Sequence, residues 1–228
     1  MNFRLTYDGA MLKAVTGNNK RKEEKHQIRR AFHVQLANLW NNTELLRDQM
    51  GALETEQLGD QQIQRSSLLN KALKNYKRGD FVCLPIIRSD MHLVCDLDIL
   101  FLRPEQPGQI IKSGGDLDNR LKTLFDALRI PNNENEIKGF KPEAFEMPFL
   151  CLLENDSLIT GFRITTDRLL EAATKPALPA DEVPRPEDVI TVERCWENHP
   201  PSFVRLIINV KIKATKLTME NMGYFSHF

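Results

Sequence analysis

The feature that most restricts the fold is a run of alternating apolar and polar residues near the C-terminal end, SFVRLIINVKIKAT (202–215). A period of two residues is typical of a β-strand with one face toward a core. Two further segments, 81–89 and 92–104, read FVCLPIIRS and HLVCDLDILFLRP and are separated by a short turn at Asp90-Met91. We expect them to pair as antiparallel strands, because so short a connection cannot cross over a sheet.

Other segments add weaker strand signals. The opening FRLTYDGAMLK (3–13) alternates and contains the turn signal Asp8-Gly9, which predicts a short strand or hairpin. Residues 148–166 predict an apolar stretch, a polar corner and a strand, and VITVERCWE (189–197) predicts another strand. The segments 131–148 and 171–188 are turn-rich and Pro-rich respectively, so both are expected to be loops.

Helical periodicity appears in three places. Residues 22–41 place five apolar residues near a period of 3.6 and predict an amphipathic helix: Ile28, Phe32, Leu36, Leu39 and Trp40. Residues 119–129 carry a second apolar face, with Asp118 or Asn119 as the natural N-cap. Residues 43–77 are rich in Gln and Glu and predict one or two surface helices broken near Gly59.

Together these elements predict an α+β fold, in which a mixed β-sheet packs against two core helices. A length of 228 residues with 41% hydrophobic residues suits a single domain, residues 1–228. We expect residues 42–78 to form a helical insertion and 171–188 an exposed loop. No apolar run is long enough for a membrane span and no leader is visible, so a cytoplasmic protein is expected.

The four cysteines lie far apart, with no C-x-x-C pair that would suggest zinc binding or redox chemistry. We expect buried, reduced thiols. Although the net charge is zero, residues 1–80 hold 14 Lys and Arg against 9 Asp and Glu. This basic excess indicates either a solvated face or a nucleic-acid footprint. The candidate DNA-binding residues are Lys20, Arg21, Lys22, Arg29, Arg30, Lys74, Lys77 and Arg78.

The segment GGDLDNRLKTLFDALRI (114–130) holds the most chemically suggestive residues. Lys122 lies one helical turn after Asp118, and Asp116 points to the same side from extended chain. A cap with an i, i+4 ion pair would explain one carboxylate but not two. Because two close carboxylates resist joint ionisation, a hard cation such as Mg²⁺ is the alternative explanation.

A third acid would strengthen a metal site. Asp156 is the candidate because it follows an apolar run and precedes a strand, where a corner can present a side chain at a sheet edge. Glu154 and Asn155 are alternates, and the sequence ENDS also fits ordinary turn chemistry.

The pattern GDLDNRLKTLFDAL followed by ENDSLI resembles the RusA family of Holliday junction resolvases. Its D-x-D-N-x-x-K-x-x-x-D-A-L helix matches seven residues here: Asp116, Asp118, Asn119, Lys122, Asp126, Ala127 and Leu128. Asp156 matches the second acid of the family's downstream corner. Asn155 stands where many members have a first aspartate, and the chain is longer than compact members and not basic.

The resemblance implies a RusA-like fold and a homodimeric endonuclease that resolves four-way junctions or other branched DNA. It implies Mg²⁺ as cofactor, with Mn²⁺ as a substitute, bound by Asp116, Asp118 and Asp156. Lys122 is implied as a catalytic helper that supplies positive charge near the scissile phosphate. We expect Asp126 to have a structural role.

Two alternatives stay open. A RusA-like dimer that binds DNA or a partner without cutting would use the same surfaces. A second D-x-D, Asp96 and Asp98, resembles the first motif of haloacid dehalogenase-type phosphatases, in which the first aspartate is the nucleophile. These two side chains share one face of a strand, so they border the metal site or simply face solvent.

Overall fold

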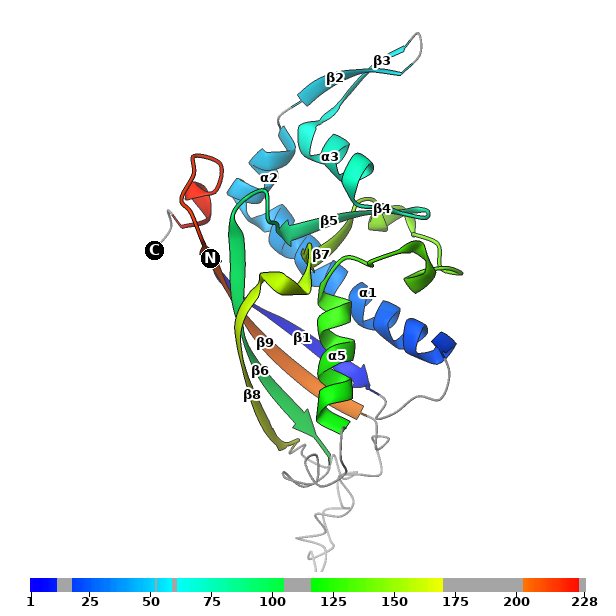
Figure 1. Ribbon diagram of the computed structural model, residues 1–228, viewed down its shortest axis with the longest axis vertical. Coiled ribbons are helices and arrows are strands. Elements are labelled where there is room, and N and C mark those ends of the chain that lie inside the picture. The colour runs from blue at the N-terminus through cyan, green and yellow to red at the C-terminus, as the bar shows by residue number, and fades with distance from the viewer. Residues whose placement is uncertain (12–17, 52, 59–60, 105–115, 170–202, 226–228) are drawn as a thin grey trace, which may run out of the picture.

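A computed structural model describes residues 1–11, 18–51, 53–58, 61–104, 116–169 and 203–225. Its main sheet has four strands in the order β1 (Asn2–Ala10), β9 (Phe203–Ala214), β6 (Leu93–Arg103) and β8 (Ile159–Arg168). The β1–β9 and β9–β6 pairs are antiparallel, and the β6–β8 pair is parallel (Figure 1). The sheet is therefore mixed, as predicted, and the α+β class is confirmed.

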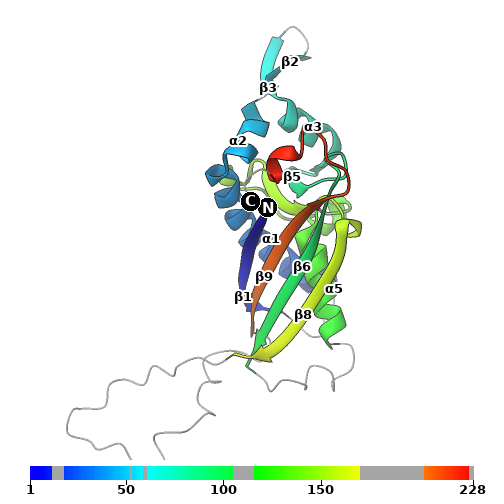
Figure 2. The ribbon, with the colours of Figure 1, turned by 90° about the vertical axis from the view of Figure 1, so that its left-hand side faces the viewer.

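Strand β9 confirms the alternation that its sequence predicts. Val204, Leu206, Ile208 and Val210 are buried, while the intervening residues are partly or fully exposed. Strand β6 alternates in the same way along its whole length. Helices α1 (Asn18–Asn42) and α5 (Asp116–Leu128) cover the buried face, and the opposite face has no helix over it among the described residues (Figure 2).

Helix α1 supplies much of the core between the sheets. Its residues Ile28, Phe32, Leu36 and Trp40 are buried, as the predicted helix over 22–41 requires. Strand β1 is one strand that continues through Asp8 and Gly9, so these residues do not form a hairpin turn. Gly9 pairs with Val204 in the β1–β9 ladder.

The prediction that residues 81–89 and 92–104 pair with each other is wrong. Strand β5 (Phe81–Ile87) joins β4 (Lys77–Arg78) and β7 (Phe149–Leu153) in a second sheet, and β5 and β7 are parallel. All seven residues of β5 are buried, unlike those of β6. An unbroken apolar run is buried on both faces, so it belongs between layers and not beside a half-exposed strand.

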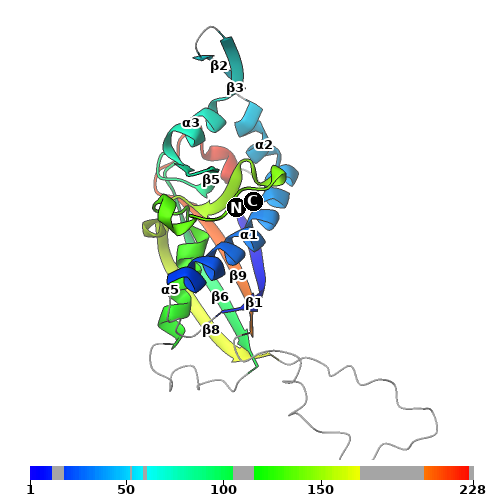
Figure 3. The same cartoon turned by 90° about the vertical axis from the view of Figure 1, so that its right-hand side faces the viewer.

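The segment expected to be helical is only partly so. Helices α2 (Glu44–Gly51) and α3 (Ser67–Asn75) flank an antiparallel hairpin of β2 (Leu53–Leu58) and β3 (Gln61–Ser66). The hairpin extends away from the rest of the fold (Figure 3). The Gln- and Glu-rich composition suggested helix formers, but the cross-strand ladder satisfies the backbone here instead.

The remaining predictions have mixed outcomes. Residues 131–148 contain short turns and the 3₁₀ helices η1 (Glu134–Glu136) and η2 (Ala144–Glu146), as expected for a turn-rich segment. A third, η3 (Asp156–Leu158), forms the predicted corner, and η5 (Met222–Tyr224) follows β9. Cys83, Cys95 and Cys151 are buried free thiols. Cys195, the loop 171–188 and the strand 189–197 lie outside the described residues.

One buried histidine makes the stability of this core sensitive to acid. The His26 ring stacks on Phe140 at 4.1 Å and meets Phe81 edge to face at 5.5 Å. Neither of its ring nitrogens has a hydrogen-bond partner among the described residues. Burial, assisted by the charges of Arg30 and Arg29, lowers the pKa of His26 to about 4.

We predict that the free energy of unfolding falls as the pH is lowered from 6.5 to 4. The unfolded chain takes up a proton at His26 near pH 6.5, whereas the folded chain does not until about pH 4. The loss is about 3 kcal/mol from this residue. Urea unfolding of the native chain and of His26→Phe across this range measures it, and equal slopes for both would contradict the prediction.

Candidate functional site

Helix α5 begins at Asp116 and not at residue 119, so the predictions that Asp116 lies on extended chain and that Asp118 or Asn119 is the N-cap are wrong. Leu124 and Leu128 are buried in the core, while Asp118 and Lys122 are exposed on the same side of the helix. The structure forms no ion pair between Asp118 and Lys122, which leaves both charges available to a ligand. Asp116 is described only as the first residue of the helix.

The acidic corner after β7 contains two residues whose side chains stabilise the fold and one whose side chain is exposed. Glu154 accepts hydrogen bonds from the Ser89 N–H at 2.7 Å and from the Ser89 hydroxyl at 2.6 Å. The Asn155 side chain caps η3 by accepting from the Ser157 N–H at 3.0 Å. Asp156 is exposed. Glu154 and Asn155 thus stabilise the corner through hydrogen bonds, whereas the side chain of Asp156 does not do so within the described residues.

Two of the three acids, Asp118 and Asp156, lie near different ends of α5. The Ile130 N–H donates to the Leu153 carbonyl at 2.9 Å, so the end of β7 lies beside the C-terminal end of α5 (Figure 1). The 3₁₀ helix η3, which begins at Asp156, follows three residues later and contacts α5. Asp118 lies ten residues before Leu128, which is about 15 Å along the helix axis. The described residues contain no group of three or more His, Cys, Asp or Glu side chains suited to a metal ion. The side chain of Asp116 lies outside the described residues, so the three-aspartate centre stays a prediction.

Asp126 has the structural role that we expected, with other partners than Lys122. Its carboxylate lies 2.6 Å from Arg129 Nη2 and 3.2 Å from Lys25 Nζ. Burial acts to raise the pKa of Asp126, but the charges of Lys25 and Arg129 lower it below its ordinary value. The carboxylate is therefore committed to holding α1 against α5.

Arg29 must be removed from the candidate DNA-binding residues. Its side chain is only 1% exposed and donates to the Asp126 carbonyl at 2.7 Å and to Glu136 Oε2 at 2.8 Å. Arg30 pairs with the buried Glu146 at 2.8 Å, and Arg78 donates to the Pro131 carbonyl at 2.9 Å. These arginines stabilise the fold, because an amphipathic helix must also satisfy the polar groups that it buries.

The other basic candidates are at the surface. Lys20 is exposed and Arg21 and Lys22 are partly exposed at the start of α1. Lys74 and Lys77 are exposed near the second sheet. Helix α1 packs against α5, and Lys25, one turn after Arg21, forms an ion pair with Asp126 at 3.2 Å.

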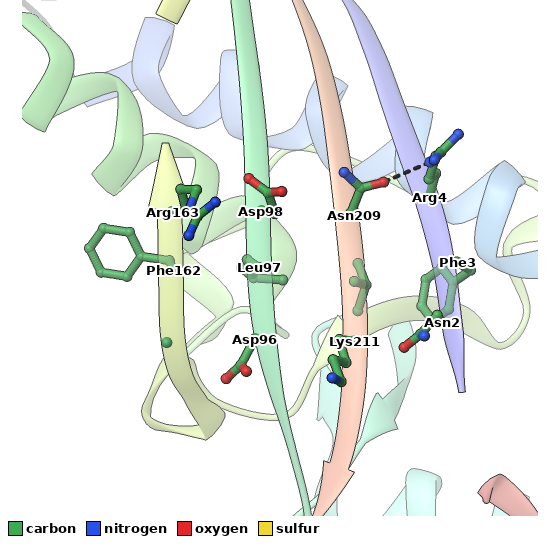
Figure 4. A pocket seen from close by; sticks show the side chains of 12 residues that line it. Asn2, Phe3, Arg4, Asp96, Leu97, Asp98, Phe162, Arg163, Asn209 and Lys211 are labelled. Atoms are coloured by element: carbon green, nitrogen blue, oxygen red, sulfur yellow. Dashed lines mark hydrogen bonds between the residues drawn. The ribbon is translucent and has the colours of Figure 1, made fainter. Parts of the chain in front are cut away.

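Asp96 and Asp98 project from the open face of the main sheet, away from the helices (Figure 4). Asp96 forms an ion pair with Lys213 and accepts a hydrogen bond from the Thr160 hydroxyl at 2.9 Å. The hydrogen bond from Lys213 lowers the pKa of Asp96. An aspartate engaged in this way, on the face opposite to α5, does not border Asp118.

The open face holds a shallow hollow of about 730 Å³ that the sequence interpretation did not single out. Besides the two aspartates, its lining includes Arg4, Arg163 and Asn209 (Figure 4). The signal available in the sequence was the set of polar residues at alternate positions in parts of β6, β8 and β9, such as Asp96 and Asp98 in β6 and Asn209 and Lys211 in β9. Without the strand order, these positions could not be assigned to one surface.

A comparison with known proteins finds no relative of this chain. No family model matches the chain, and neither a curated protein nor a solved structure is significantly similar to it. Among the described residues, every helix is too short or too polar to span a lipid bilayer.

We predict that Asp126→Asn lowers the free energy of unfolding by about 2 kcal/mol, since it leaves partly buried cations without their counter-charge. Asp118→Asn, eight residues earlier on the same helix, is the matched control and should leave stability unchanged because that carboxylate is exposed. Urea unfolding at pH 7 measures both. Equal losses for the two variants would show that Asp126 is not the structural carboxylate.

Proposed function

We propose that this chain is a metal-dependent endonuclease that cuts branched DNA, with four-way junctions as the substrate class. The observation that carries the proposal is the packing of α1 on α5, fixed by the Lys25–Asp126 ion pair at 3.2 Å. It joins the basic start of α1 to the helix that bears Asp118 and Lys122. An enzyme that cuts DNA needs both features. Cationic side chains bind the phosphate backbone, and a pair of carboxylates holds the metal ion at the phosphodiester that is cut.

In this proposal Asp116 and Asp118 hold a divalent cation, Mg²⁺ or Mn²⁺. Carboxylate oxygens are the donors that Mg²⁺ prefers, and one or two of them are sufficient because the ion keeps several waters. The bound ion supplies charge neutralisation at the phosphate and lowers the pKa of a water. Lys122, exposed one turn further along α5, adds positive charge near the leaving oxygen.

Asp156 has no part in this two-carboxylate centre of a single chain, since it follows β7, whose end is hydrogen-bonded to Ile130 just after the C-terminal end of α5. Its separation favours a second candidate function, a RusA-like protein that binds branched DNA without cutting it. Both functions use the same basic residues, Lys20, Arg21 and Lys22. We assign the protein to the cytoplasm in this proposal, in keeping with its free buried thiols.

The test is incubation of the purified full chain with a labelled synthetic four-way junction, with Mg²⁺ or with a chelator. We expect metal-dependent paired nicks, and a loss of about 100-fold or more in rate for Asp118→Asn. Asp156→Asn should cut at close to the native rate. Because both acids are exposed, neither change should impair folding.

Three outcomes would change the assignment. Junction that is bound but left intact with every metal supports the binding protein. Loss of cutting in Asp156→Asn as well as Asp118→Asn overturns the two-carboxylate centre and indicates that a second chain supplies the third acid. Junction that is neither bound nor cut overturns both candidate functions.

Binding can be measured separately from cutting. The double variant Lys20→Ala with Lys22→Ala should weaken junction binding and reduce the slope of log affinity against log salt by about 2, because two phosphate contacts are lost. The control is Lys211→Ala, which removes an exposed lysine from the open face of the main sheet and should leave the salt slope unaltered. An unchanged slope in the double variant would exclude the start of α1 from the DNA interface.

A further inference from the structure

The two edges of the main sheet differ in how they are protected. At β1, the side chain of Gln35 from α1 accepts from the Thr6 N–H at 2.8 Å and donates to the Thr6 carbonyl at 2.7 Å. This contact occupies the outer hydrogen-bonding groups in the middle of the strand. Exposed edge strands otherwise recruit further strands, so β1 is closed to pairing.

Strand β8 forms the other edge and lacks such a cover among the described residues. The Leu169 N–H donates to the Arg103 carbonyl at 2.7 Å, so odd-numbered residues of β8 direct their backbone groups toward β6. Even-numbered residues direct theirs outward. The outward groups of Phe162, Ile164 and Thr166 make no backbone hydrogen bond within the described residues.

We propose that β8 pairs antiparallel with β8 of a second copy of this chain, across a two-fold axis that passes through Thr165. A symmetric pair of this kind uses the same surface on both subunits. It would join the two main sheets into one continuous sheet of eight strands. The proposal does not depend on the nuclease assignment, because it concerns the edge of the sheet and not the motif helix.

The direction of the backbone groups restricts the possible registers. Outward groups must face outward groups, so even-numbered residues must pair with even-numbered ones and the axis must pass through a residue. An axis through Thr165 sets Ile164 opposite Thr166 and Phe162 opposite Arg168 of the second copy. Both pairs consist of even-numbered residues, as hydrogen bonding requires.

The charges select this register among the permitted ones. Arg163 and Asp167 are the charged residues of β8 that share the open face of the sheet, and they are symmetric about Thr165. An axis there sets each Arg163 opposite Asp167 of the other copy, so two pairs of opposite charges form across the interface. An axis through Arg163 would oppose two arginines, and an axis through Ile164 would set Asp167 opposite Gly161. Opposite charges across a non-hydrogen-bonded pair stabilise it, and like charges destabilise it.

The side chains at this edge expose one apolar ring and two charged groups that a second copy could contact. Phe162 is 58% exposed although its ring packs against Phe125 of α5 at 5.4 Å. Arg163 is exposed and has no ion pair or hydrogen bond in the described part of the chain. The Asp167 carboxylate accepts from the Arg168 N–H at 2.7 Å through one oxygen, which leaves its second oxygen for a cation.

Charge reversal tests the register directly by sedimentation equilibrium of the full chain without DNA. Arg163→Asp and Asp167→Arg should each weaken the dimer about tenfold or more, because each opposes like charges at two places. The double variant carrying both changes should restore the native affinity. A chain that is monomeric at all concentrations, or a dimer that is indifferent to the single reversals, would overturn the proposal.

Disulfide trapping supplies an independent measurement in a Cys195→Ser background. Thr165→Cys should form a covalent dimer on mild oxidation, because the axis brings residue 165 of both copies together. Thr6→Cys is the matched control, an exposed threonine on the closed edge, and should stay monomeric. Equal trapping at both positions would indicate random collision and contradict the proposed pairing.

Discussion

The burial of the Arg29 guanidinium between α1 and α5 is the interaction on which the arrangement of the helices depends. Arg29 donates to the Asp126 carbonyl and to Glu136, while Asp126 is held in turn by Arg129 and Lys25. A buried cation is costly unless its partners are well placed, so this network tolerates little displacement of one helix against the other. It thereby fixes where the exposed side of α5 stands relative to the start of α1.

That arrangement packs the first half of α1 against the C-terminal half of α5, through the contacts of Lys25 and Arg29 with Asp126. The path of the chain after α5 places Asp156 near that same end of the helix. The chain leaves α5 at its C-terminal end, passes through residues 131–148, and returns in β7 to the same end, where Ile130 bonds to Leu153. A strand that ends beside the helix C-terminus cannot deliver its corner to the helix N-terminus, which lies about 15 Å away.

The two-layer organisation leaves one face and one edge of the main sheet open. Strands that alternate, such as β6 and β9, need helices on one side only, and α1 and α5 provide that cover. The open side therefore carries polar residues, including Asp96 and Asp98. The same exposure at β8 leaves backbone groups and charges that a second copy can satisfy.

The sequence by itself determined the local elements: the amphipathic helix of α1, the alternating strand β9, the motif helix and the corner at Asp156. These follow from periodicity and turn chemistry, which act between residues close in the chain. Which strands pair, which arginines are buried and which end of α5 meets Asp156 were decided only by tertiary structure. The antiparallel pairing expected of residues 81–89 and 92–104 failed for this reason, and so did the DNA-binding role expected of Arg29. Such choices depend on packing and charge satisfaction between residues distant in sequence, which local patterns do not encode.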